Sequence, residues 1–269
     1  MIVAIILADR LEPLIHGQAP YFLPVSGDGD IEDEEDGETV LERLTRTVLR
    51  GPFGGTIVAA APEHEARIKE LLSGFAVQHL KLSPARAHVS EALMFAEAFR
   101  ARWQKAMAAA AQRFPVIEES DDEEEEAEAS PKGKKAVRRP QAKGKPAPQE
   151  WSKHHKSADV KIRGLARSFE RDGVILFRGE QPISRPDLQA QVVEAFGREG
   201  AEKAGAARPM AQAVYQSVRG YPVLLSVDAA KEAAALPRAT DFDDWLLQQL
   251  KRVQDVSVDD PAAIQRIHL

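Results

Sequence analysis

The chain has 269 residues, 43% of them hydrophobic, and a formal net charge of −6 at pH 7. This negative balance excludes a global positive field that would draw the protein to nucleic acid or to an anionic membrane surface. Cysteine is absent, which excludes disulfides, thiolate catalysis and cysteine-bound metals. The length and the apolar content favour one α/β domain that carries an insertion.

The first predicted element is a strand over Ile2–Ala8, a continuous aliphatic run typical of a strand buried on both faces of a parallel sheet. No Lys or Arg precedes this run, and Asp9 and Arg10 follow it directly, unlike a signal peptide, so we expect a cytoplasmic protein. No other run approaches the roughly 18 apolar residues that span a bilayer, so no membrane partner is expected. A long exposed loop follows, and its segment 28–38 holds eight carboxylates.

Strands and helices then alternate as far as residue 116. We predict helices over 39–49, 63–72 and 90–114, because their apolar residues recur at a spacing of about 3.6. Strands are predicted over 55–61 and 76–80. An apolar stripe on the third helix is interpreted as core packing, and it consists of Leu93, Phe95, Ala96, Phe99, Trp103 and Met107.

A highly charged segment interrupts the pattern. Residues 118–128 contain nine acids and no base, and residues 132–145 contain seven bases and no acid. Such blocks have little to bury, so we predict a disordered insertion over 117–156 between two halves of one domain, 1–116 and 157–269. The insertion is a candidate contact for a protein partner. Nucleic acid is not expected to bind there, because the acidic block competes for the same bases.

Regular structure is predicted to resume after the insertion. We expect helices over 160–170, 184–196, 228–235 and 241–250, and strands over 173–177, 210–216, 222–226 and 254–258. In the second of these helices, Ser184 is the predicted N-cap and Pro186 lies in the first turn. The alternation predicts a three-layer α/β/α sandwich with a mostly parallel, mixed central sheet. Ligands in such sheets bind beyond the carboxyl ends of strands, here the loops after Ala8, Phe177 and Ser226.

Three ordered segments of the sequence carry a resemblance to a known family. The first is IVAIILA at 2–8, followed by FLPV at 22–25 and ETVLER at 38–43. The second is GVILFRGEQP at 173–182, and the third is AVYQSVRGYPVLL at 213–225. In this order they resemble the MobA-like NTP transferase family, the GT-A-like group whose enzymes attach CMP or GMP to molybdopterin. The family pattern ends a strand in Gly-Asp-Gln-Pro where the second segment has Gly-Glu-Gln-Pro, and it has Gly-His-Pro where the third has Gly-Tyr-Pro.

The resemblance implies a nucleotide-diphospho-sugar-transferase-like fold and an activity. That activity is transfer of a nucleotidyl group from CTP or GTP to a phosphorylated, cofactor-type acceptor, with Mg²⁺ as cofactor. The metal-binding aspartate of the family corresponds to Glu180, and a surface glutamate is the alternative interpretation. The other residues that the resemblance assigns are Ala8, Asp9, Arg10 and Ser90 on the nucleotide side, and Gly220, Tyr221 and Pro222 on the acceptor side. Ser90 could instead be an N-cap, and Tyr221 a packed aromatic between two strands.

The phosphate-binding turn departs from the family pattern, which reads Leu-Ala-Ala-Gly-x-Ser-x-Arg-Met-Gly-x-x-Lys after the first strand. Here Arg10 replaces the early glycine, Glu12 replaces the small residue, and the family lysine falls on Ala19 or Pro20. A carboxylate and bulky side chains oppose a triphosphate at this position. The second family carboxylate, near the C-terminus, has no counterpart within 265–269. An alternative function is therefore a catalytically inactive descendant that acts as a scaffold or protein-interaction module.

Overall fold

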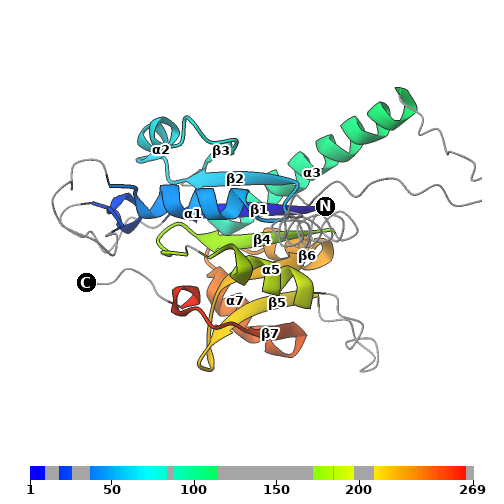
Figure 1. Cartoon of the computed structure of the whole chain (residues 1–269). Helices are drawn as coiled ribbons and strands as arrows, with labels where there is room; N and C mark the ends of the chain where they lie inside the picture. The colour runs from blue at the N-terminus through cyan, green and yellow to red at the C-terminus, as the bar shows by residue number, and fades with distance from the viewer. Residues whose placement is uncertain are drawn as a thin grey trace, which may run out of the picture.

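The computed structural model describes residues 1–9, 18–25, 37–83, 88–113, 172–183, 185–196 and 209–264. These residues form a seven-stranded sheet in the order β3-β2-β1-β4-β6-β5-β7 (Figure 1). Several predictions lie outside the described residues: the disordered insertion over 117–156, the helix over 160–170, the positions of Arg10 and Glu12, most of the acidic loop over 28–38 and the lack of an acid within 265–269.

The centre of the sheet is built from parallel strands. Four neighbouring strands run in the same direction: β1 (Ile2–Ala8), β2 (Gly55–Ala60), β3 (Gln78–Lys81) and β4 (Gly173–Arg178). Ile5 in β1 pairs with Ile57 on one side and with Leu176 on the other. All seven residues of β1 are buried, which confirms the prediction of a central strand covered on both faces.

One reversed strand makes the sheet mixed. β6 (Val218–Ser226) runs antiparallel to β4 and to β5 (Met210–Tyr215), and β7 (Val253–Ser257) runs parallel to β5. Ser226 pairs with Gly173, at the amino end of β4. The prediction that the loop after Ser226 joins the ligand-binding edge is therefore wrong, because β6 is reversed. Its early residues, Gly220 and Tyr221, extend toward that edge instead.

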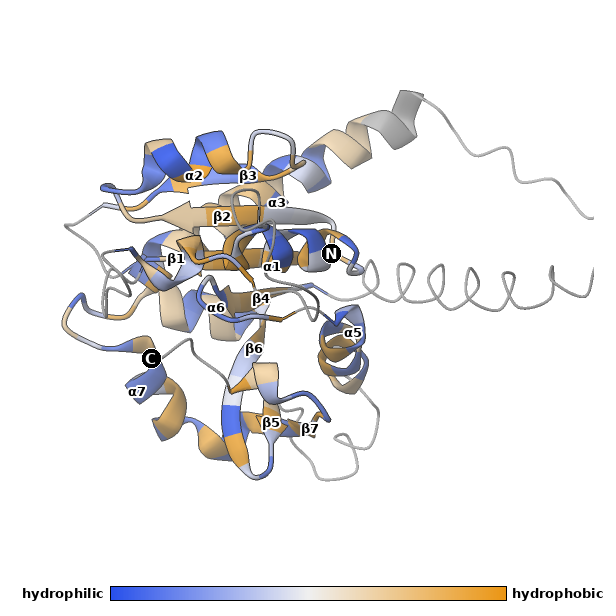
Figure 2. Ribbon diagram, turned by 60° about the vertical axis from the view of Figure 1, so that its left-hand side comes forward, coloured by the Kyte–Doolittle hydropathy of each residue, from blue (hydrophilic) through white to orange (hydrophobic). Residues whose placement is uncertain are grey.

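Helices cover both faces of the sheet. One face carries α1 (Val40–Leu49), α2 (Glu65–Leu71) and α5 (Pro186–Ala195), and the other carries α3 (His88–Arg113), α6 (Val227–Ala234) and α7 (Phe242–Gln248). Alternate residues of β1 enter the two cores, as side chains in a strand must. Figure 2 shows hydrophobic and hydrophilic residues within both α2 and α5, as expected for helices with one covered side. The predicted three-layer α/β/α sandwich is confirmed.

Two local predictions on the helices are wrong. The N-cap of α5 is Arg185 and not Ser184, although Pro186 does occupy the first turn. In α3, Ala96 is fully buried, whereas Met107 is 50% exposed. The end of α3 projects away from the sheet in Figure 1, so Met107 has no core to enter. Among the described helices, none combines the length and the apolarity that crossing a bilayer requires.

Candidate active site

The candidate site is built where β1 and β4 end side by side. Leu7 pairs with Arg178, and the backbone N–H of Gly179 donates to the carbonyl of Leu7 at 2.8 Å. A Cβ at Gly179 would lie 3.0 Å from that carbonyl, so the absence of a side chain permits the close approach. Asp9 and Glu180 therefore follow two adjacent strands at one edge of the sheet.

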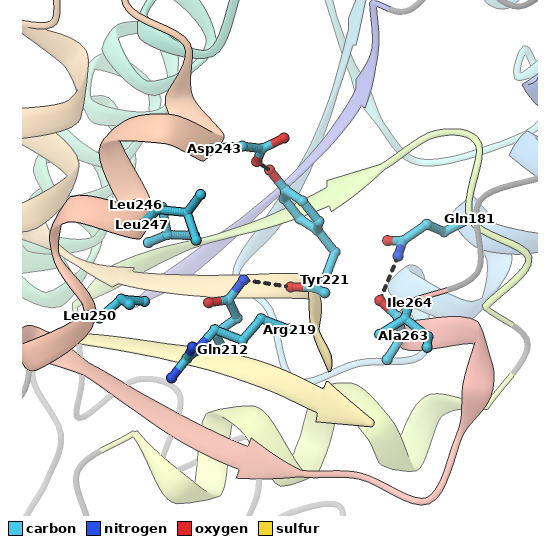
Figure 3. A pocket seen from close by; sticks show the side chains of 11 residues that line it. Gln181, Gln212, Arg219, Tyr221, Asp243, Leu246, Leu247, Leu250, Ala263 and Ile264 are labelled. Carbon is cyan, nitrogen blue, oxygen red and sulfur yellow. Dashed lines mark hydrogen bonds between the residues drawn. The ribbon is translucent and has the colours of Figure 1, made fainter. Parts of the chain in front are cut away.

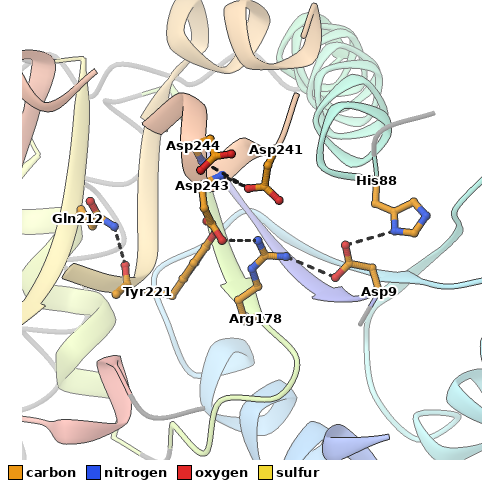
Figure 4. Close-up of polar contacts among 9 residues, drawn as sticks. Asp9, His88, Arg178, Gln212, Tyr221, Asp241, Asp243 and Asp244 are labelled. Atoms are coloured by element: carbon orange, nitrogen blue, oxygen red, sulfur yellow. Dashed lines mark hydrogen bonds and ion pairs between the residues drawn. The ribbon is translucent and has the colours of Figure 1, made fainter. Parts of the chain in front are cut away.

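Arg178 lies at the centre of this edge and is 4% exposed. Its Nη1 is 3.5 Å from Oδ1 of Asp9, and its Nη2 is 3.2 Å from Oδ2 of Asp243 (Figure 4). Its guanidinium carbon lies 5.0 Å from the centre of the Tyr221 ring. Burial lowers the pKa of Arg178, but the phenol and the three carboxylates around it outweigh burial and raise that pKa. The site thus holds a permanent buried cation.

Asp243 joins this cation to Tyr221. The Tyr221 hydroxyl donates a hydrogen bond to Oδ1 of Asp243. Asp243 is held in the first turn of α7, where its backbone N–H donates to the N-cap side chain of Asp241 at 2.7 Å. Burial raises the pKa of the Tyr221 phenol, so the hydroxyl stays protonated and remains a donor. The Tyr221 ring is 3% exposed and packs in the core on the α3 side, as the packed-aromatic alternative predicts, while its hydroxyl belongs to this polar cluster.

The line of polar contacts that runs from Tyr221 through Arg178 ends at His88, the first residue of α3. We call this line the array. Its Nδ1 lies 3.3 Å from Oδ2 of Asp9, and this hydrogen bond raises the pKa of His88. Asp9 consequently bridges His88 and Arg178 (Figure 4). Ser90 is the third residue of α3 and its hydroxyl donates to the carbonyl of Ala233 at 3.1 Å. The N-cap interpretation of Ser90 is therefore wrong.

Two pockets open on either side of the array. The histidine-side pocket has a volume of about 360 Å³, and its lining includes Asp9, His88, Ser90, Arg178, Arg238 and Thr240. The tyrosine-side pocket has a volume of about 160 Å³, and its lining includes Gln181, Gln212, Arg219, Gly220, Tyr221 and Asp243 (Figure 3). The salt bridge between Arg178 and Asp243 connects the walls of the two pockets.

Comparisons with known proteins bear on the fold of the chain. No family model matches the sequence, and no curated protein matches it either. Among solved structures, a nucleotidyl transferase from Methanothermobacter is similar, with 14% identity, a TM-score of 0.55, and coverage of 99% of this chain and 91% of that one. The chain has a nucleotidyltransferase-like α/β fold.

Two further structures share this nucleotidyltransferase-like fold. One is 4-diphosphocytidyl-2C-methyl-D-erythritol synthase from Anaerococcus prevotii, with 14% identity, a TM-score of 0.52, and coverage of 99% of this chain and 90% of that one. The other is the homolog of Mycobacterium tuberculosis Rv0371c from Mycobacterium sp. strain JC1, with 15% identity and a TM-score of 0.52. That match covers 100% of this chain and 89% of the homolog. At these identities, the matches establish the fold alone.

Glu180 is 3% exposed, so the surface-glutamate alternative is wrong. Burial raises the pKa of the Tyr21 phenol, and the nearby carboxylates of Asp9 and Glu180 raise it further. These two carboxylates therefore lie near the same phenol, whose buried hydroxyl has no hydrogen-bond partner within the described part of the chain. That part contains no group of three or more His, Asp or Glu side chains suited to a metal. Mg²⁺ commonly takes one or two protein carboxylates and completes its shell with water and substrate phosphates, and Asp9 and Glu180 are the carboxylates that follow β1 and β4 at this edge.

Of the remaining predicted residues, Ser90 and Gly220 line a pocket, whereas Ala8 and Pro222 line neither of the two. Ala8 ends β1 and is buried beside the histidine-side pocket, which Asp9 and Ser90 line. Gly220 and Tyr221 line the tyrosine-side pocket, and Pro222 follows them within β6.

Sequence reasoning missed Arg178 and Asp243. Arg178 carried a usable signal, because an arginine that ends a strand buried on both faces requires a buried partner. Asp243 carried none, because its contact with Arg178 joins residues 65 positions apart.

Proposed function

We propose that this chain is a MobA-like nucleotidyltransferase that binds CTP or GTP in the histidine-side pocket and an acceptor in the tyrosine-side pocket. The observation that carries the proposal is the shared wall: Arg178 lines one pocket, Asp243 lines the other, and the two side chains are paired. Both pockets lie at the carboxyl edge of β1 and β4, where α/β sheets bind ligands. The fold shared with solved nucleotidyltransferases supports this assignment.

The reaction joins two anionic groups, so the site must neutralise charge. An oxygen of the acceptor phosphate attacks the α-phosphorus of the nucleotide, a new P–O bond forms, and diphosphate leaves. Arg178 supplies a fixed positive charge at the boundary of the pockets, where negative charge develops on the phosphate oxygens during the transfer. His88, whose pKa is raised by Asp9, supplies a second positive charge when protonated. Asp9 and Glu180 would hold Mg²⁺, which when bound neutralises the phosphate oxygens.

Nucleotide binding tests the proposal directly. Isothermal titration calorimetry with CTP, GTP and ATP, each with and without Mg²⁺, should give a magnesium-dependent signal for CTP or GTP with the wild-type chain. Glu180→Ala should abolish that signal. Glu232→Ala serves as the matched control, because Glu232 is paired with Arg252 at the surface and lines neither pocket.

The opposite result would identify the alternative function. Flat traces with every nucleotide would overturn the enzyme assignment and favour a non-catalytic scaffold or protein-interaction module. The replacement of the glycine-rich turn by Arg10 and Glu12 would then be the cause, because these side chains oppose a triphosphate.

A further inference from the structure

We propose that the tyrosine-side pocket selects an uncharged group that donates hydrogen bonds and that it rejects phosphate, with Gln181 and Gln212 as the specificity-determining residues. One part of the inference rests on the proposed function, namely that the uncharged group belongs to the acceptor. The selectivity of the pocket is a separate property, and it can be measured without nucleotide.

Both glutamine side chains present an acceptor whose orientation is fixed. Gln212 in β5 is 6% exposed and its Nε2 donates to the carbonyl of Gly220 at 3.0 Å. Gln181 is 2% exposed and its Nε2 donates to the carbonyl of Ala263 at 2.9 Å. Because a backbone carbonyl is an acceptor and only the NH₂ group of an amide is a donor, each amide must direct its oxygen the other way. Figure 3 shows both amide groups beside the cavity.

Neither of these buried amide oxygens has a hydrogen-bond partner among the described residues. A buried acceptor without a partner costs free energy, and a ligand that donates a hydrogen bond would remove that cost. One such oxygen is not sufficient as a signal, because Gln189 has one as well, in the contact between α1 and α5. The signal is the convergence of two of them on one cavity.

The charges around the pocket oppose an anion. Among its described lining residues the one cation is Arg219, which is held by Asp255 through two hydrogen bonds of 2.8 and 2.7 Å. Asp243 adds a carboxylate that Arg178 and the Tyr221 hydroxyl already engage. Acceptor oxygens thus outnumber free donors on this wall, so a phosphate would meet repulsion there.

The opposite wall is apolar and suits a hydrocarbon frame. It is formed by Leu246, Leu247 and Leu250, and Leu247 is 58% exposed, so its surface is available to a ligand. With a volume of about 160 Å³, the pocket has room for a group about the size of one ring. The chemistry recognised is therefore a compact apolar frame that carries uncharged hydroxyl or amino donors, and a phosphate on the same ligand would lie outside, toward Arg178.

Ligand-observed saturation-transfer NMR on the full chain without nucleotide tests this selectivity. The probes are cis-1,2-cyclohexanediol for the hydroxyl source, aniline for the amino source, and inorganic phosphate as the competitor. At least one of the first two should bind saturably, and phosphate should not displace it. Gln212→Leu should weaken that binding roughly tenfold, as expected for one lost hydrogen bond. Gln189→Leu is the matched control and should bind as the wild type does.

Each other outcome overturns the proposal. It fails if neither probe binds saturably, if phosphate displaces the bound probe, or if Gln189→Leu weakens binding as much as Gln212→Leu. Gln181→Met repeats the test should Gln212→Leu fail to fold. A chain that binds a probe but no nucleotide would retain this pocket and lose the proposed function, so the two failures are distinguishable.

Discussion

The Nη2 of Arg178, at the end of β4, lies 3.2 Å from Oδ2 of Asp243, in the first turn of α7. The Arg178 side chain is 5% exposed and that of Asp243 is 30% exposed, so the pair is largely shielded from water. This contact attaches α7 to the edge of the sheet. It also places one ion pair between the two pockets.

Arg178→Met should lower the free energy of unfolding by about 3–5 kcal/mol, because Asp9 and Asp243 would keep their charges in a buried place without the guanidinium. Urea denaturation measures this change. The double variant Arg178→Met/Asp243→Asn should recover part of the loss. Arg185→Met is the control, since Arg185 pairs with Asp187 at the surface and its side chain is 55% exposed. A wild-type midpoint for Arg178→Met would show that this cation does not stabilise the site.

Gly220→Ala should distort the tyrosine-side pocket. A Cβ there would lie 1.9 Å from the carbonyl oxygen of Ala263, so the short helix η5 (Pro261–Ala263) must move. We expect a loss of about 1–3 kcal/mol in the free energy of unfolding, as for other overpacked sites. Gly74→Ala is the matched control, because a Cβ at Gly74 meets nothing within 4 Å. Equal unfolding curves for the two variants would contradict the close approach.

Thr39→Ala should destabilise the start of α1. The Thr39 hydroxyl accepts from the backbone N–H of Glu42 at 3.2 Å, and the Glu42 carboxylate accepts from the backbone N–H of Thr39 at 2.9 Å. Losing the threonine half of this capping box should cost about 1 kcal/mol. Thr39→Ser keeps the hydroxyl and should retain most of the stability in thermal unfolding. If serine were as harmful as alanine, packing of the methyl group would be the cause instead.

His64 should make stability fall as the solution becomes acidic. Burial lowers its pKa below the ordinary value of 6.5, and the neutral ring stacks on Phe22 with 5.2 Å between ring centres. Below that ordinary value, the unfolded chain binds a proton that the folded chain resists, so unfolding is favoured. Above pH 6.5 both states are neutral and the effect vanishes. His64→Phe should flatten the pH dependence in urea titrations, and an NMR titration that places the pKa of His64 above 6.5 would refute it.

Local patterns in the sequence were sufficient for most of the elements. Ile2–Ala8 was predicted with its observed bounds, because a strand buried on both faces is apolar at every position. The capping box sets the start of α1 within one residue of the prediction. In the described part of the second half, α5, α6 and α7 lie where the sequence predicted them, with ends that differ by one or two residues.

The site was only partly predictable from those patterns. Asp9, Glu180 and Tyr221 lie at the carboxyl edge of β1 and β4, and the roles that the family resemblance gives them stay predictions. The reversal of β6 was not predicted, because a buried apolar strand reads the same in either direction. It moved the loop after Ser226 away from the site and brought Tyr221 toward it.

The amino-acid sequence by itself determined the layers of this protein, since strand and helix periodicity are properties of neighbouring residues. Only the tertiary structure decided which polar groups meet. Arg178 finds Asp243, and Gln181 comes to share a cavity with Gln212, through strand direction and helix packing. These contacts join residues far apart in the chain, so no local spacing records them, and the charge and hydrogen-bonding character of the two pockets follows from them.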